Sequence, residues 1–397
     1  MLSNSGYPLA LLHRSILYKK PTQIQHGFFV ITGILLYVFT YGLDTVHSLI
    51  AVLCTYLITN FMPGKTESII VAHVSLMGYL MVAYWFEESD GYDIIWTTPF
   101  CVMTLRFIGL VMDVYDGVHC KKLKEDQKNT AIQDIPGLLE IAAFGFFYTG
   151  TFAGPQFTLI KFRQCINGEW LNEQKGPRQS ALQASLYRFL GGCVYMAVNQ
   201  CGTAWVPNSY FNTQEFYNQS FFWRWTWVTI WFRLVISRYC AMWMITEGAA
   251  ILNGLGYNGK DKNGEDRWDG VRDIHVWKWE TGSDFTSHIM RRLRWLNSKP
   301  AAHIITLGYL AIWHGYHLGY FLLFGLEFGC MLAQKQLYTL IDQMPGLAEF
   351  LARPQVRPFT WLFGRLTVLY SMSFGFLTFG LVKTRYWIGV SDTLFIH

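Results

Sequence analysis

The stretch AAHIITLGYLAIWHGYHLGYFLLFGLEFGCMLA, residues 301–333, is apolar over a length that can cross a lipid bilayer. About 20 mostly apolar residues are enough for a helix to span the hydrocarbon core. His314 lies inside this stretch. Because a titratable side chain is costly at that depth, an intramembrane histidine indicates a functional group that faces a cavity or the interior of a bundle. A buried histidine that only donates to a helix carbonyl is the alternative, and the stretch alone does not decide between them.

The whole chain has the composition of a membrane protein. Hydrophobic residues make up 52% of its 397 residues and charged residues only 15%, whereas soluble domains carry about 25% charged residues. We predict an all-α, polytopic membrane helical bundle with about eight to ten membrane segments. The apolar segments that support this prediction are 27–42, 47–62, 69–86, 100–112, 138–154, 184–201, 222–252, 301–333 and 359–382.

Several other function classes lack support in the sequence. The net charge of +5 is spread thinly, without a basic block of the kind that binds nucleic acid, so we expect no nucleic-acid partner. Gly254, Gly256 and Gly259 match the GxGxxG pattern, but no alternation of strand and helix surrounds them. The sequence contains no Gly-x-Ser-x-Gly turn, so it does not favour a serine hydrolase.

Two glycines and a second histidine follow His314 closely. Gly315 and Gly319 are four residues apart, and we expect them on one helical face, where small residues let another helix approach. His317 should lie one helical turn from His314. Two histidines at this spacing could hold a metal ion, but no Cys, Asp or Glu cluster completes a ligand set nearby, so we expect no metal.

The residues that we predict to contact substrate are aromatic or polar side chains in or beside apolar segments: Trp313, His317, Tyr320, Glu140 and Gln156. Glu140 stands near the start of the segment 138–154, where a carboxylate could instead cap a helix N-terminus. Gln156 belongs to the tetrad Gly-Pro-Gln-Phe, residues 154–157, which should break the helix and could orient a polar headgroup.

Arg106 and Asp113 lie two helical turns apart in an otherwise apolar stretch. They could form an internal ion pair or part of a headgroup site, and we favour the structural pair.

Several blocks of the sequence resemble one known family. WHGYHLGY, residues 313–320, resembles the histidine motif of the membrane-bound O-acyltransferases. Four further blocks are similar to the branch of that family that acylates lysophospholipids, and they run in the same order over nearly the whole chain. They are YDIIWTTPFCVMTLRFIGLVMDVYDG (92–117), IPGLLEIAAFGFFYTGTFAGPQF (135–157), ITEGAAILNGLGYNG (245–259) and RRLRWLNSKP (291–300).

The resemblance implies a helical bundle around a tunnel in the endoplasmic reticulum membrane. Acyl-CoA would enter from the cytosol as co-substrate, and the lysophospholipid would come from the bilayer. The branch that the blocks resemble implies lysophosphatidylcholine as this lysophospholipid. No cofactor is expected to stay bound, and a homodimer is compatible with the family. His314 would act as the general base on the free glycerol hydroxyl, which then attacks the thioester.

The sequence departs from the family's pattern at one place. Relatives carry an Asn-containing stretch ahead of the histidine segment, whereas here WKWETGSDFTSHI (277–289) runs directly into MRRLRWLNSKP (290–300). We therefore expect a single membrane domain over residues 1–397 that is shortened at both ends and lacks a segment near 289/290. The alternatives are a catalytically impaired, lipid-binding form of the enzyme and a family member that acylates a protein or a sterol.

Overall fold

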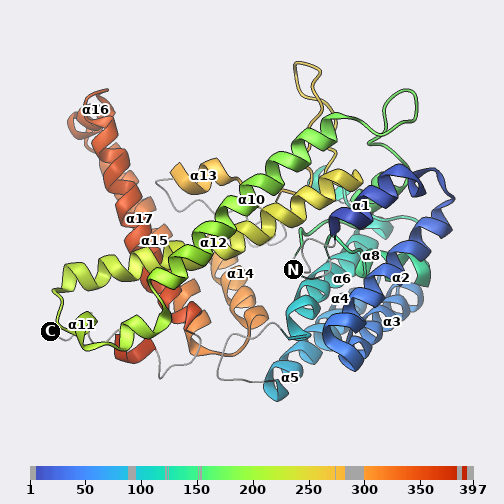
Figure 1. Ribbon diagram of the computed structural model, residues 1–397, viewed down its shortest axis with the longest axis horizontal. Helices are drawn as coiled ribbons and strands as arrows, with labels where there is room; N and C mark the ends of the chain where they lie inside the picture. Colours follow the sequence, from blue (N-terminus) through green and yellow to red (C-terminus); the bar gives the residue numbers. More distant parts are fainter. Residues whose placement is uncertain are drawn as a thin grey trace. The chain divides into compact units, whose positions relative to one another are not determined.

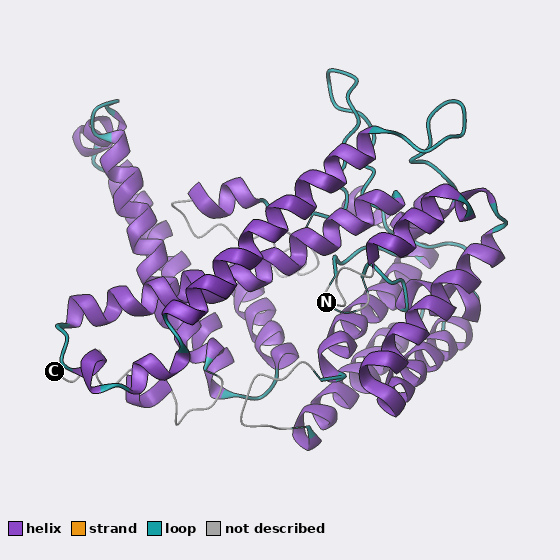
Figure 2. Ribbon diagram, in the orientation of Figure 1, coloured by secondary structure: helices purple, strands orange, loops and turns teal. Residues whose placement is uncertain are grey.

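The computed structural model describes residues 6–87, 95–120, 123, 125–150, 152, 154–272, 274–281, 299–381 and 387–390 (Figure 1). Helices form all the regular secondary structure in these ranges, without a strand (Figure 2). Two isolated bridges, Leu171 to Pro177 and Lys260 to Asp266, close tight loops. The predicted all-α fold is confirmed.

The contacts divide the chain into two compact units. The first consists of Met1–Glu88, Ile94–Met196 and Tyr239–Ile274, and the second of Ser89–Asp93, Ala197–Arg238 and His275–His397. The single domain expected from the sequence stays a prediction.

The first unit contains most of the N-terminal helices. They are α1 (Gly6–Ser15), η2 (Leu17–Lys19), α2 (Thr22–Tyr41), η3 (Gly42–Asp44), α3 (Thr45–Phe61), α4 (Thr66–Ala72), the π-helix η4 (His73–Met77), α5 (Gly78–Phe86), α6 (Thr97–Val118), α7 (Glu125–Lys128), α8 (Leu138–Gly145) and α9 (Leu159–Ile166).

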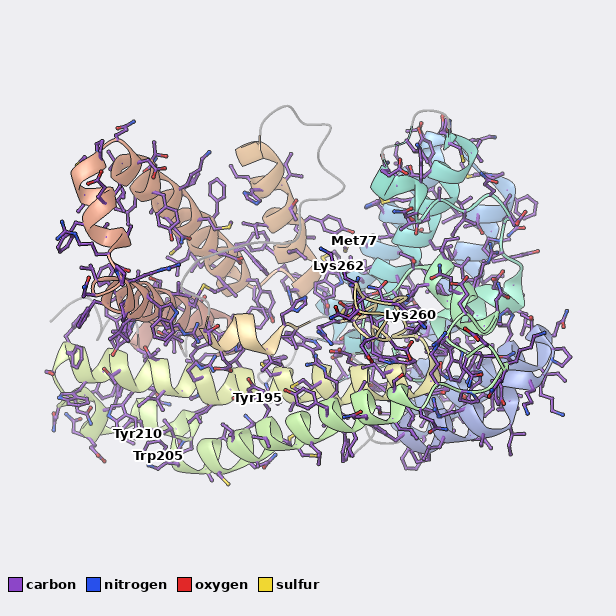
Figure 3. All side chains as sticks on the ribbon, turned by 90° about the horizontal axis from the view of Figure 1, so that it is seen from above. Met77, Tyr195, Trp205, Tyr210, Lys260 and Lys262 are labelled. Carbon is purple, nitrogen blue, oxygen red and sulfur yellow. The ribbon has the colours of Figure 1, made fainter. Side chains whose placement is uncertain are left out.

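Two long helices, α10 (Ser180–Trp205) and α12 (Phe221–Asn253), contribute residues to both units. They run alongside each other in Figures 1 and 3, where Tyr195 and Trp205 lie on α10 and Lys260 and Lys262 lie on the loop that follows α12. The remaining helices of the second unit are η6 (Asn208–Asn212), α11 (Gln214–Tyr217), α13 (Val276–Thr281), α14 (Lys299–His314), α15 (Leu318–Asp342), α16 (Pro345–Ala352) and α17 (Arg357–Gly380).

Five helical runs in the described ranges are long and apolar enough to cross a membrane: Thr22–Phe61, Thr66–Phe86, Thr97–Val118, Phe221–Asn253 and Arg357–Gly380. The first of them holds two helices, α2 and α3. These five runs coincide with six of the predicted apolar segments, since Thr22–Phe61 covers both 27–42 and 47–62. The number of eight to ten membrane segments stays a prediction.

The prediction that residues 138–154 form one membrane segment is wrong. The helix α8 covers only Leu138–Gly145, and α9 begins at Leu159. Eight helical residues rise about 12 Å, which is too short to cross a bilayer. The carbonyl groups that this break frees are bonded inside the unit, because Arg106 donates to those of Phe144, Gly150 and Pro155 at 3.2, 2.7 and 3.4 Å.

The same contacts correct the expectation for Arg106 and Asp113. Within the described ranges these two side chains form no ion pair with each other. Arg106 instead holds the chain between α8 and α9, and its guanidinium lies 4.4 Å from the ring centre of Phe157. A buried guanidinium needs acceptors for its donors, and here backbone carbonyls accept from both Nη atoms.

Aromatic side chains form the core between α2, α8 and α9. The ring centres of Phe29 and Phe147 are 4.8 Å apart, and that of Phe147 is 5.5 Å from that of Phe162. Gly33 lets α2 approach this region, since a Cβ atom there would collide with the carbonyl of Phe146. The first unit is therefore closely packed around the break that follows α8.

Candidate active site

His314 is the last residue of α14, and the chain turns directly after it. Gly315 adopts a φ of 127°, and its N–H donates to the carbonyl of Ile312 at 3.0 Å. The helix α15 then begins at Leu318. The stretch 301–333 is therefore two helices and not the single helix that we predicted, because Gly315 takes a backbone conformation that residues with a side chain rarely adopt.

Four aromatic rings surround the imidazole of His314. The rings of Trp313 and Phe379 meet it edge to face, with centres 4.5 and 5.1 Å away. Phe324 stacks on it at 5.7 Å with an interplanar angle of 29°, and Tyr320 lies at 5.8 Å. In the part of the chain that the structure describes, no side chain or backbone group forms a hydrogen bond with this imidazole. Its nitrogens are thus left for another molecule.

Gly319 brings α17 close to this site. A Cβ atom on Gly319 would collide with the carbonyl oxygen of Thr378, and the Thr378 hydroxyl donates to the Gly319 carbonyl at 2.9 Å. The close approach expected from the two glycines is confirmed for Gly319. The prediction that Gly315 shares a helical face with Gly319 is wrong, because Gly315 forms the turn between α14 and α15. Thr378 is the neighbour of Phe379, so this contact also sets the position of the ring against His314.

Trp313, Tyr320 and His317 lie together near His314, though not on one helix, and their role in substrate binding stays a prediction. Tyr320 lies between the two histidines, since its ring centre is 5.7 Å from that of His317 as well as 5.8 Å from that of His314. His317 is the residue before α15 and not the next turn of a helix that carries His314, so the predicted one-turn relation is wrong. The described residues contain no group of three His, Cys, Asp or Glu side chains placed to hold a metal ion.

Glu140 and Gln156 belong to the first unit, and both have structural partners there. Glu140, in the first turn of α8, forms a two-pronged ion pair with Arg163 at 2.7 and 2.9 Å. This pair raises the pKa of the Arg163 guanidinium. The Gln156 amide donates to the carbonyl of Val102 at 2.9 Å. A substrate-binding role for these two residues stays a prediction.

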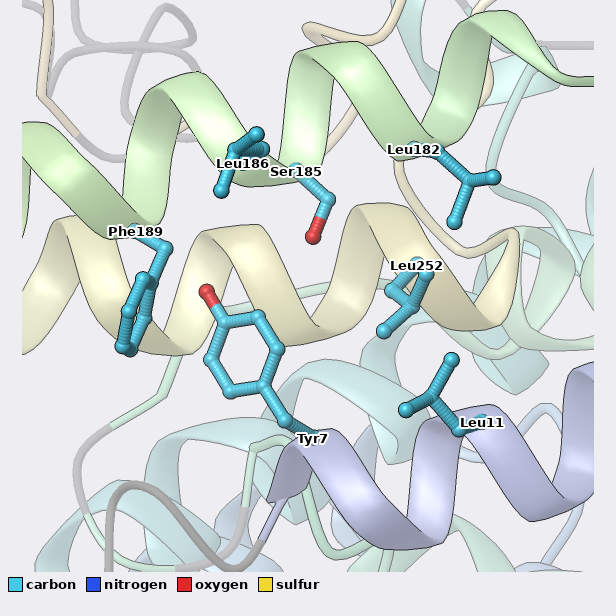
Figure 4. A pocket seen from close by; sticks show the side chains of 7 residues that line it. All are labelled: Tyr7, Leu11, Leu182, Ser185, Leu186, Phe189 and Leu252. Atoms are coloured by element: carbon cyan, nitrogen blue, oxygen red, sulfur yellow. The ribbon is translucent and has the colours of Figure 1, made fainter.

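A separate apolar cavity of about 440 Å³ lies between α1, α10 and α12 (Figure 4). Its lining consists of Tyr7, Leu11, Leu182, Ser185, Leu186, Phe189 and Leu252. Both hydroxyls already donate to backbone carbonyls, that of Tyr7 to Ile245 at 3.1 Å and that of Ser185 to Gly248 at 2.7 Å. The lining therefore offers no acid or base for catalysis near neutral pH.

Sequence reasoning missed Phe324 and Phe379 as neighbours of His314. Phe324 lies on α15, just after the histidine motif. A prediction that a new helix begins after the motif could have placed its side chain near His314. Phe379 lies 65 positions beyond His314 along the chain, and its contact depends on the packing of α17 that Gly319 permits. No local pattern carries that information.

Comparisons with known proteins identify the family of the chain. The profile of the membrane-bound O-acyltransferase family matches residues 81–373. A lysophospholipid acyltransferase 5 of Caenorhabditis elegans is 58% identical over 98% of this chain and 86% of its own length. The proteins of the same name from Mus musculus and Homo sapiens are 32% and 31% identical, each over 98% of this chain and 83% of their own lengths. The chain therefore belongs to the membrane-bound O-acyltransferase family.

Proposed function

We propose that this chain moves a fatty acyl group from acyl-CoA to a lysophospholipid, with lysophosphatidylcholine as the acceptor. The observation that carries the proposal is the imidazole of His314, which lies among four aromatic rings and forms no hydrogen bond in the described part of the chain. The names of the relatives support the choice of a lysophospholipid as acceptor.

In the proposed reaction His314 acts as a general base. An imidazole nitrogen takes the proton of the free glycerol hydroxyl while the oxygen attacks the carbonyl carbon of the thioester. The carbon–sulfur bond then breaks, and the imidazolium returns the proton to the thiolate of coenzyme A. Histidine suits both proton transfers because its ordinary pKa lies near neutral pH. The transfer is direct, so it requires no nucleophilic side chain.

The aromatic surroundings of His314 serve this chemistry in two ways. They keep bulk water, a competing acyl acceptor, away from the thioester. The rings of Phe324 and Phe379 also carry no hydrogen-bonding group, so these two rings do not compete with the substrate for the imidazole nitrogens.

The experiment is an acyl-transfer assay in microsomes that express the chain, with polyunsaturated acyl-CoA and lysophosphatidylcholine. We expect phosphatidylcholine to form and His314→Ala to abolish it. His73→Ala is the matched control, since His73 also lies in a run that can cross the membrane but its Nδ1 bonds the Ile69 carbonyl at 2.8 Å. Activity that survives His314→Ala would refute the mechanism, and transfer to a sterol or a peptide alone would refute the acceptor.

A second candidate is a catalytically impaired, lipid-binding form of the enzyme. This candidate depends on the missing Asn-containing segment near 289/290, and that junction lies outside the described residues. About 389 residues of this chain, 98% of 397, are aligned with the worm relative, so about 18 of the 407 aligned positions have no counterpart here. An inactive chain that regains activity when an Asn-bearing segment is inserted after Ile289 would favour this candidate.

The proposed setting is the endoplasmic reticulum membrane, with acyl-CoA reaching the protein from the cytosolic side. The multi-pass character has support in the five apolar helical runs. A homodimer is a further part of the proposal, and size measurements on the purified protein in nanodiscs test it.

A further inference from the structure

The proposed mechanism does not use the apolar cavity between α1, α10 and α12 in the first unit. Its volume of about 440 Å³ lies within the usual range of small-molecule sites. Three of the leucines that line it, Leu11, Leu182 and Leu186, are 50%, 42% and 56% exposed. The cavity therefore opens to the outside of the unit, where an apolar chain can enter it and gain apolar contact on several sides.

The cavity lies at one end of a helix that can cross the membrane. Leu252, which lines it, is the next-to-last residue of the run Phe221–Asn253. The neighbouring helix α1 exposes further apolar side chains, Leu12 at 41% and Ile16 at 54%. A short helix with apolar residues on its outside and basic residues at its end is typical of the membrane interface. Phospholipids place their phosphate at this depth and their acyl chains beside the end of the span.

A buried arginine without a counter-ion lies next to the cavity. Arg14 of α1 is only 7% exposed, and within the described ranges no carboxylate forms an ion pair with it. Its Nη2 donates to the carbonyl of Arg178 at 2.7 Å, whereas its Nη1 is buried without a hydrogen-bond partner in that part of the chain. A buried donor requires an acceptor and a buried charge requires a countercharge. An anion would supply both.

Two helix faces place the Arg14 guanidinium at one end of the cavity. Tyr7, Leu11 and Arg14 follow one another at spacings of four and three residues, so they share a face of α1. Arg178, which accepts the bond from Arg14, comes four residues before Leu182. Figure 4 shows Leu11 and Leu182 at the same end of the cavity. The guanidinium therefore lies about one helical turn beyond that end.

The charges around Arg14 favour a ligand with a net negative headgroup. Arg178 is already paired with Asp266 at 2.8 Å, so these three side chains together carry a net charge of +1. The Nε of Arg178 is a second buried donor without a partner in the described ranges. Two exposed lysines, Lys19 and Lys20, follow α1 directly. Basic pockets at the ends of membrane helices are typical sites for anionic lipid headgroups.

We propose that this cavity binds one anionic phospholipid of the bilayer, with an acyl chain against Leu11, Leu182 and Leu186 and the phosphate at Nη1 of Arg14. A guanidinium suits the phosphate because its planar donors match the phosphate oxygens. The lipid is a bound structural partner and not the acyl acceptor, since the lining offers no acid or base near neutral pH. This inference does not depend on the proposed function.

The test uses the full chain in detergent micelles and measures binding of phosphatidylserine by native mass spectrometry, with phosphatidylcholine as the zwitterionic comparison. We expect phosphatidylserine to bind more tightly. Arg14→Gln should weaken its binding about ten-fold or more, because a charge-assisted contact is lost. It should also reduce the preference over phosphatidylcholine. Lys128→Gln, which removes an exposed lysine in the same unit, should change little.

A second pair of variants tests the apolar part of the site and leaves Arg14 in place. Leu182→Trp adds volume at the mouth of the cavity and should weaken phosphatidylserine binding several-fold. Val194→Trp is the matched control, because Val194 is 63% exposed on the same helix and does not line the cavity. Neither variant replaces a buried residue, so both should fold, which size-exclusion chromatography checks.

Several results would overturn the inference. Equal binding of phosphatidylserine and phosphatidylcholine would remove the anionic headgroup. Equal effects of Arg14→Gln and Lys128→Gln, or of Leu182→Trp and Val194→Trp, would remove the site from this cavity. Displacement of the bound lipid by lysophosphatidylcholine or acyl-CoA would make the cavity part of a substrate path. Displacement by inorganic phosphate alone would make it a simple anion site, whereas a lipid held also by its acyl chain should stay bound.

Discussion

His13 and His314 are both removed from bulk water, but their surroundings differ. His13, on α1 in the first unit, is fully buried and forms hydrogen bonds through both ring nitrogens. Its Nε2 lies 2.9 Å from Oε1 of Gln25, and its Nδ1 lies 3.1 Å from Nδ2 of Asn253. His314 in the second unit has only ring contacts in the described part of the chain. The hydrogen bonds of the imidazole, and not its burial, therefore distinguish a structural histidine from a candidate general base.

The network around His13 is closed. The amide nitrogen of Asn253 also lies 2.7 Å from the Tyr148 hydroxyl, and the Cys165 thiol donates to the amide oxygen at 3.3 Å. Since the Asn253 amide nitrogen can only donate, Nδ1 of His13 accepts and Nε2 carries the proton. No lone pair or proton of this imidazole remains for a substrate.

The largest expected effect separates the two histidines by activity. His314→Ala should lower acyl transfer by about 10²–10⁴-fold, the usual contribution of a general base. The assay must be normalised to folded protein, which size-exclusion chromatography of a fluorescent fusion measures. Equal losses of activity in His314→Ala and His13→Ala would remove the distinction between the two sites.

The next effect separates them by stability. His13→Ala should lower the free energy of unfolding by about 2–4 kcal/mol, because it leaves buried groups of Gln25 and Asn253 without partners and opens a cavity. His314→Ala should cost less, since no hydrogen bond is lost. Unfolding in mixed micelles of lipid and detergent measures both. A larger loss of stability in His314→Ala than in His13→Ala would contradict the assignment of His13 as the structural histidine.

The sequence predicted the helical fold and the family, and the role of His314 stays a prediction. It could do so because apolar length and the motif WHGYHLGY are local features. From the sequence we predicted one helix at the place where Gly315 forms a turn. A glycine inside an apolar run is compatible both with a close contact between helices and with a break in the helix, so the pattern does not distinguish the two. The contact of the Phe379 ring with His314 depends on which helices pack together, which the spacing of residues does not encode.

A pH series sharpens the contrast at His13. Burial lowers the pKa of His13 to about 4, whereas an unfolded histidine has a pKa of about 6.5. Between these values the unfolded chain binds the proton and the folded chain does not, so stability is complete above pH 6.5 and falls as the pH drops towards 4. At pH 5 the loss should be about 2 kcal/mol relative to pH 7. His13→Gln should show a smaller loss over the same range, and an identical loss in both proteins would remove His13 as its cause.

The smallest expected effect tests the aromatic surroundings of His314. Phe324→Leu keeps an apolar side chain on α15 but removes the ring that stacks on the imidazole at 5.7 Å. A stacked aromatic pair contributes about 0.5–1.5 kcal/mol beyond its buried area, so kcat should fall about two- to ten-fold. Phe321→Leu is the matched control, because Phe321 is exposed on the same helix. If the ring positions the base, KM for both substrates stays constant while kcat falls. A fall in stability without a change in kcat would instead make Phe324 a packing residue and leave the orientation of His314 to Trp313 and Phe379.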